Sequence, residues 1–118
     1  MSAEAAEAGQ FFPTFIREMS EVDIPNPNIY AWMAVDKCQV LFYEVPEGST
    51  SPDDSHANEW GLVIKGQVDI TIDGETKVYG PGDTYFVRDG EVHSVVNHPG
   101  LIAIAVFEGE DRFGVRGS

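Results

Sequence analysis

The sequence has few of the residues that mark several large classes of protein. It contains one cysteine, Cys38, so no disulfide can form within the chain. No apolar run approaches the length of about 18 residues that a membrane-spanning helix needs. The N-terminal segment MSAEAAEAGQ has neither the basic start nor the apolar centre of a secretion signal. These absences predict a cytoplasmic protein that is not inserted in a membrane.

Basic residues are also scarce. The chain has 7 lysines and arginines against 20 acidic residues, which gives a formal net charge of −13. Nucleic acids and anionic membranes are bound by clustered basic side chains, so we expect neither as a partner. The acidity has two explanations, ordinary solubility and adaptation to high salt, and we favour the first because charge of this kind serves solubility in many proteins.

Glycine and strand-forming residues are plentiful, and they indicate an all-β domain. The 118 residues are enough for one domain. Turn signals such as Asp73-Gly74 and Asp89-Gly90 separate short runs of Val, Ile, Tyr, Phe and Thr. We predict a sandwich or barrel with less than roughly a tenth helix. Its strands are expected at 28–35, 38–45, 60–65, 68–72, 75–79, 84–87, 92–97 and 101–107, with Pro46–Asp54 as a loop.

The ends of the chain differ from its centre in composition. Residues 1–27 contain an Ala/Glu-rich start and three prolines, so we expect a flexible or extended arm before a barrel at 28–113 and a short tail at 114–118. The apolar run Phe11–Ile16 must pack on an outer sheet face, of its own subunit or of a partner's. We predict a homodimer, because the proline-stiffened link at Pro25–Pro27 suits reaching across a two-fold interface.

Two of the three histidines lie in glycine-punctuated motifs about 37 residues apart. The motifs are His56-x2-Glu59-x6-Gly66 and Gly82-x5-Arg88-x-Gly90-x2-His93-x3-Asn97. Bringing the two histidines together requires a closed or sandwiched sheet. The third histidine, His98, stands before Pro-Gly and is expected in a turn.

This pair of motifs resembles the two sequence motifs of the cupin superfamily, over roughly residues 38 to 107. The second motif departs from the family only where Arg88 replaces a proline. In the first, Asp54 stands in the place of the first histidine, and the compact spacing followed by Trp60-Gly61 is similar to that of small single-domain cupins. The resemblance implies an antiparallel jelly-roll β-barrel with a pocket between its sheets.

The resemblance also implies a metal site formed by Asp54, His56, Glu59 and His93. Imidazole and carboxylate ligands suit a divalent transition metal such as Fe, Mn, Ni or Zn. The alternatives are that the histidines are structural residues and that Asp54 caps a turn. We expect the substrate pocket to be lined by Trp60, Val63, Tyr85, Val95 and Phe107, with core packing as the alternative for the aromatic residues.

Two functions remain open. The first is a metal-dependent enzyme, of isomerase, lyase or dioxygenase type, that acts on a small oxygenated organic molecule. Some small cupins ketonise unsaturated uronates with an acidic residue and an arginine near the final strand, and here Arg112 follows that strand with acidic neighbours. The second is a non-catalytic cupin with a degraded metal site that binds or senses a small ligand. The sequence shows no clear pocket Tyr, Lys or extra His as an acid or base, which favours the second.

Overall fold

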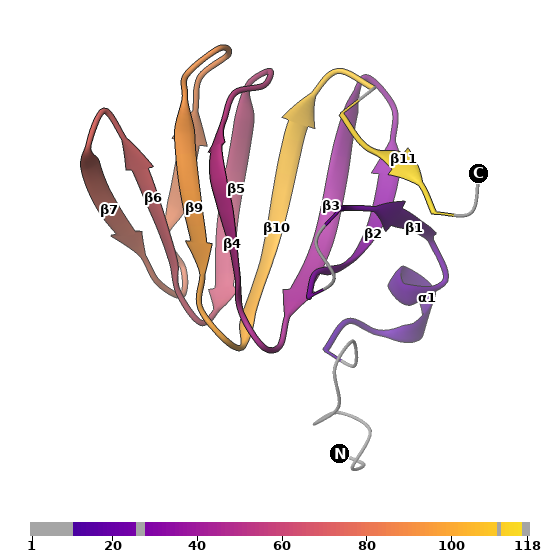
Figure 1. Cartoon of the computed structure of the whole chain (residues 1–118). Coiled ribbons are helices and arrows are strands. Elements are labelled where there is room, and N and C mark those ends of the chain that lie inside the picture. The colour runs from indigo at the N-terminus through magenta and orange to yellow at the C-terminus, as the bar shows by residue number, and fades with distance from the viewer. Residues whose placement is uncertain (1–10, 26–27, 111, 117–118) are drawn as a thin grey trace.

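The computed structural model describes residues 11–25, 28–110 and 112–116. Figure 1 shows the path of the chain. In chain order the elements are α1 (Thr14–Arg17), β1 (Ser20–Asp23), β2 (Tyr30–Val35), β3 (Cys38–Val45), β4 (Ser49–Asp54), β5 (Glu59–Lys65), β6 (Val68–Ile72), β7 (Glu75–Tyr79), β8 (Thr84–Val87), β9 (His93–Asn97), β10 (Leu101–Glu108) and β11 (Gly114–Val115).

The strands form two antiparallel sheets. The larger has seven strands in the order β11-β1-β2-β3-β10-β5-β8, and the smaller has four in the order β4-β9-β6-β7 (Figure 1). This confirms the predicted all-β antiparallel fold. Among the described residues, no strand of one sheet is hydrogen-bonded to a strand of the other, so the two sheets face each other as a sandwich. In the described residues the only α-helix is the four-residue α1, and no helix there is long and apolar enough to span a bilayer.

The hairpin between β6 and β7 forms as the sequence predicts. Asp73 and Gly74 both have positive φ, 52° and 76°. A two-residue turn of this type matches the right-handed twist of the strands that it joins, and Asp-Gly tolerates the backbone angles that it needs. The register that follows pairs Ile72 with Glu75 and Val68 with Tyr79.

The prediction that Pro46–Asp54 is a loop is wrong in its second half. Ser49–Asp54 forms β4, an edge strand that pairs with β9. Its register shifts between Ser51 and Asp54, around Pro52. An edge strand with an irregularity accommodates a proline, which cannot donate a ladder hydrogen bond. The polar composition that indicated a loop reflects this exposed edge.

The segment that we assigned to the arm contains β1, which pairs with both β2 and β11. Phe12 is buried and contacts the rings of Trp32 and Phe42 on its own larger sheet. The backbone amides of Phe11 and Phe12 each donate a 3.2 Å hydrogen bond to Glu44 Oε2. The division into arm, barrel and tail stays a prediction; residues 1–10, 26 and 27 of the arm and 117 and 118 of the tail lie outside the described residues.

The core lies between the two sheets, and strand alternation determines which residues enter it. Along β10, Leu101, Ala103, Ala105 and Phe107 are buried while the residues between them are not. The small alanines leave room that larger side chains would fill. Ala105 accordingly lines a cavity, which opens between the sheets near the first residues of β5 and β9.

Candidate metal centre and ligand cavity

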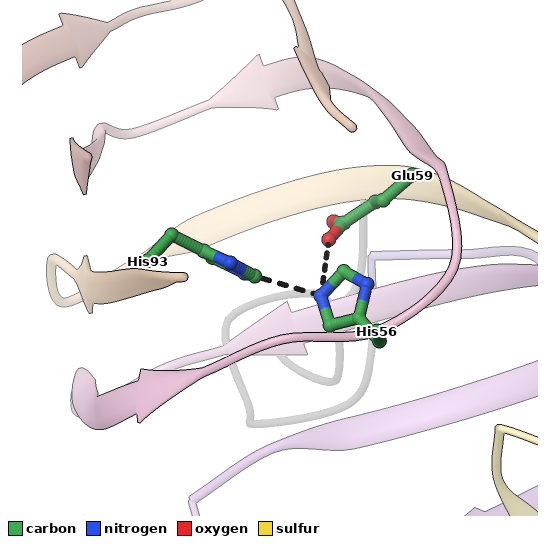
Figure 2. A group of neighbouring side chains, drawn as sticks. All are labelled: His56, Glu59 and His93. Atoms are coloured by element: carbon green, nitrogen blue, oxygen red, sulfur yellow. Dashed lines mark hydrogen bonds and ion pairs between the residues drawn. The ribbon is translucent and has the colours of Figure 1, made fainter. Parts of the chain in front are cut away.

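His56, Glu59 and His93 meet at the wall of this cavity. His56 lies in the connection between β4 and β5, Glu59 begins β5, and His93 begins β9. His56 Nε2 lies 3.1 Å from His93 Nε2 and 3.4 Å from Glu59 Oε1 (Figure 2). The ligand atoms that the three residues offer all lie within 4.8 Å of one another. The facing sheets thus join two histidines that are 37 residues apart in the sequence.

Backbone carbonyls set the orientation of both imidazole rings. His56 Nδ1 donates to the carbonyl of Ala57 at 2.7 Å, and His93 Nδ1 donates to the carbonyl of Glu91 at 3.0 Å. A carbonyl only accepts, so each Nδ1 carries a proton, and in its neutral form each ring presents an Nε2 lone pair to the other. Two lone pairs and a carboxylate oxygen therefore face one space, an arrangement that a cation satisfies. The donor set fits a metal ion.

Tyr85 holds the carboxylate of Glu59 in place. The Tyr85 hydroxyl donates a 2.8 Å hydrogen bond to Glu59 Oε2, which leaves Oε1 directed toward His56. Burial raises the pKa of Glu59, and the hydrogen bond from Tyr85 opposes part of that rise. The Tyr85 ring lies against Gly61, where a Cβ atom would overlap it. Gly61, two residues after Glu59, is thus required for the support of the carboxylate.

His56 is suited to serve as a neutral ligand. Burial lowers its pKa, and the nearby positive charge of Arg112 lowers it further. The hydrogen bond to the Ala57 carbonyl raises the pKa of His56, but the effects that lower the pKa are larger in sum. The imidazole is therefore in its neutral form at pH 7, the form that binds metal ions.

The structure does not bring Asp54 into this group. Its side chain is exposed, and its Oδ2 accepts a 3.2 Å hydrogen bond from Arg112 at the cavity. Burial acts to raise the pKa of Asp54, but hydrogen bonds from the Ser55 amide and Arg112 outweigh it, so the pKa is lowered. An ionised carboxylate held by an arginine at the surface is a different arrangement from a buried metal ligand.

The cavity has a volume of about 520 Å³. Of the predicted pocket residues, Phe107 lines it and four do not: Trp60, Val63, Tyr85 and Val95. Val63 and Tyr85 are buried in the core, and Val95 packs against it. Trp60 follows Glu59 on β5, so strand alternation directs it to the outer face, where it is 42% exposed.

Tyr43 and Arg112 line the cavity, although neither was among the predicted site residues. Tyr43 on β3 is buried and lines it, which corrects the inference that the pocket offers no tyrosine. Burial raises the pKa of Tyr43, so its hydroxyl stays protonated. The alternation of Leu41 and Tyr43 on β3 was the signal that could have located it. Arg112 also lines the cavity, from the segment after β10, for which no periodic pattern exists.

His98 lies outside the cavity lining. Its Nε2 contacts Asp69 Oδ2 at 2.9 Å and Gln67 Nε2 at 3.3 Å. This cluster joins the turn after β9 to β6, and the histidine therefore has a structural partner. It provides a natural control for experiments on His56 and His93.

Comparison with known proteins identifies the family. A family model described as the cupin domain matches residues 41–107. The chain belongs to the cupin family. The match contains His56, Glu59 and His93. It also contains most of β3 and β10 and all of the strands between them. No curated protein matches this cupin in sequence.

Solved structures resemble this cupin in fold. An RmlC-like cupin from Shewanella frigidimarina has a TM-score of 0.68 and 21% identity, with 80% of this chain and 88% of that chain covered. KdgF from a Halomonas species has a TM-score of 0.66 and 18% identity, with coverages of 77% and 87%. A cupin superfamily protein from Desulfitobacterium hafniense has a TM-score of 0.60 and 15% identity, with coverages of 75% and 84%. At these identities the similarity establishes the fold alone.

Proposed function

We propose that this cupin binds a divalent transition metal through His56, Glu59 and His93 and holds a small oxygenated organic molecule in the adjoining cavity. The observation that carries the proposal is the orientation of the two imidazoles. Their Nε2 atoms face each other at 3.1 Å while both Nδ1 atoms donate to carbonyls. A bound cation would remove the repulsion between the facing lone pairs.

The three residues would hold Fe, Mn, Ni or Zn, all of which accept imidazole and carboxylate ligands. Three protein ligands leave coordination positions open on the side of the cavity. A bound ion would act there as a Lewis acid toward a carbonyl or carboxylate oxygen. Tyr85 supports this role by fixing Glu59 through its hydrogen bond, as partners of metal ligands generally do.

The lining of the cavity supports a small ligand with both oxygen groups and an apolar part. Polar groups come from Tyr43, Asn97 and Arg112 and from acidic residues such as Asp23 and Asp53, while residues such as Leu41 and Phe107 supply apolar surface. The volume of about 520 Å³ lies within the usual range for small-molecule sites, about 300–1,000 Å³. A few convergent polar groups on an apolar wall are typical of such sites.

A catalytic role is the second candidate, of isomerase, lyase or dioxygenase type. Tyr43 favours it, because it lines the cavity and its hydroxyl stays protonated. That hydroxyl now lies 3.5 Å from the Tyr85 hydroxyl and would turn away from it to donate to a reacting oxygen. The alternative is a binding or sensing protein whose metal site lacks a fourth protein ligand, since Asp54 lies with Arg112 instead.

Metal binding tests the proposal directly. The protein is purified without added metal and without a nickel column, its metal content is measured, and the apoprotein is titrated with Mn, Fe, Ni and Zn. We expect about one ion per chain, and a rise in the melting temperature on binding.

The double variant His56→Ala, His93→Ala should lose this binding, whereas His98→Ala should keep it. The control removes a histidine of the same chain that contacts Asp69 outside the cavity. Equal metal binding by the parent and the double variant would show that the site is wrongly placed.

A further inference from the structure

Arg112 occupies a fixed position at the cavity. It is the only lysine or arginine among the described residues that line it. Its guanidinium lies 5.4 Å from the ring centroid of Phe107 and 4.9 Å from that of Phe113. Gln39 accepts from the Phe113 amide and donates to the Phe113 carbonyl, at 2.9 and 2.7 Å, which holds the neighbouring backbone. A cation held in this way is prepared to bind an anion.

The present partner of Arg112 is easily replaced. A single 3.2 Å contact joins Arg112 to Asp54, whose side chain is 56% exposed. A guanidinium binds a carboxylate best through two parallel hydrogen bonds, and the structure gives this pair one. Exposed ion pairs of this kind contribute little to stability, so a better-placed carboxylate can displace Asp54.

Phe107 connects Arg112 with the candidate metal centre. Its ring centroid lies 5.3 Å from that of His56 and 5.4 Å from the guanidinium of Arg112. One small molecule lying along this ring can therefore reach both groups. Such a molecule needs a carboxylate at one end and hydroxyl or carbonyl oxygens at the other.

We propose that Arg112 binds the carboxylate of a hydroxylated organic acid in the cavity. Until this acid enters, Arg112 is paired with the carboxylate of Asp54. The inference rests on the proposed function, because it names the class of ligand for the same cavity. Asp54 was expected from the sequence to be a metal ligand. On this proposal it instead competes with the carboxylate of the ligand for Arg112. The competition makes the cavity selective for anions that pair with Arg112 better than Asp54 does.

Gluconate and sorbitol test the proposal, because they share a six-carbon chain of hydroxyl groups and differ at the end where gluconate carries a carboxylate. Binding of each is measured by calorimetry at fixed ionic strength, with the metal-free and the metal-loaded protein. We expect the parent to bind gluconate more tightly than sorbitol. Asp54→Asn should raise the gluconate affinity about two- to fivefold, the range of an exposed ion pair, and leave sorbitol unchanged.

Asp53→Asn is the matched control, since it removes the same charge from an adjacent residue of the cavity lining. Arg112→Gln should abolish the preference for gluconate, and adding Asp54→Asn to it should change nothing further. An equal gain from Asp53→Asn, or a gain from Asp54→Asn that persists without Arg112, would overturn the proposal as a general charge effect. So would a parent that binds the two compounds equally.

The outcome separates this inference from the proposed function. If the protein binds no metal but prefers gluconate through Arg112, the metal site fails and the carboxylate site stands. If metal binds at His56 and His93 but Asp54→Asn has no effect, the metal site stands and the competition between Asp54 and the ligand is refuted. Circular dichroism of each variant confirms that a lost affinity is not a lost fold.

Discussion

Gln39 and Phe113 are joined by two hydrogen bonds across 74 residues of sequence. Gln39 Nε2 donates to the Phe113 carbonyl at 2.7 Å, and the Phe113 amide donates to Gln39 Oε1 at 2.9 Å. Gln39 also donates to the carbonyl of Glu110 at 3.0 Å and is only 1% exposed. One buried amide on β3 thus holds the chain that follows β10, and with it the position of Arg112.

Replacing Gln39 with leucine should therefore loosen this segment. The substitution leaves the amide of Phe113 and two carbonyls without their partner, which we expect to lower the free energy of unfolding by about 1–3 kcal/mol. Hydrogen exchange at the Phe113 amide should become faster than in the parent. Gln67→Leu is the control, because Gln67 is only half-buried and contacts Asp69 and His98. Unchanged exchange at Phe113 would show that the side chain of Gln39 is not the anchor.

Gly61→Ala should disturb the candidate metal centre through Tyr85. An alanine Cβ at this position would overlap the Tyr85 ring, whose hydroxyl holds Glu59. Forced overpacking of a core destabilises a protein by about 1–3 kcal/mol, and we expect weaker metal binding as well. Gly80→Ala is the control, since the nearest atom to its Cβ would be Asp83 Oδ2 at 3.9 Å. Chemical denaturation and metal titration of both variants check the prediction, and equal behaviour of the two would contradict it.

The convergence of His56 and His93 could be predicted because two regular features determine it. Glycine-bounded short strands require facing sheets, and the family motifs place the two histidines at matching ends of them. Strand alternation also assigns Glu59 and Gly61 to the inner side of β5. By the same rule it assigns Trp60 to the outer side, and our expectation that Trp60 lines the pocket did not take this alternation into account.

The contribution of Arg112 to the cavity could not be predicted, because it depends on contacts between distant parts of the chain. The segment after β10 has no periodic pattern, and its position follows from the hydrogen bonds with Gln39. The strand Ser49–Asp54 was missed for a related reason. Its polar sequence is typical of a loop, and only pairing with β9 makes it extended.

The buried carboxyl of Glu59 should make stability depend on pH. Burial raises its pKa above the ordinary value of 4.5. Below pH 4.5 the carboxyl is protonated in the folded and unfolded protein alike. As the pH rises above 4.5 the unfolded state loses this proton first, so the contribution of Glu59 to the free energy of unfolding decreases until the folded protein ionises too.

Glu59→Gln removes this contribution. In metal-free buffer with a chelator, the variant should gain stability relative to the parent as the pH rises from 4 to 7, as measured by urea unfolding at each pH. The exposed Glu75→Gln variant is the control for the loss of one charge. A difference between Glu59→Gln and the parent that does not change with pH, beyond that of the control, would contradict the prediction.

The outer face of the larger sheet presents an apolar area that bears on the predicted homodimer. Trp60 on β5 and Phe86 on β8 are cross-strand partners and are 42% and 53% exposed. Val106 on β10 lies opposite Trp60 on its other side. Phe12 covers another part of the same sheet, at Trp32.

We expect a second copy to cover the area around Trp60 and Phe86. The chain carries a net charge of −13, so two copies can approach each other with least repulsion through apolar faces. Each large apolar side chain that becomes buried contributes about 1.5–3 kcal/mol to association. Phe86→Glu should convert the dimer to a monomer in sedimentation velocity at tens of micromolar, because it places a carboxylate in an apolar contact. Val78→Glu, on β7 of the smaller sheet and 59% exposed, should remain dimeric. Parent protein that sediments as a monomer under these conditions would rule out the dimer, and a Phe86→Glu variant that stays dimeric would place the interface on another face.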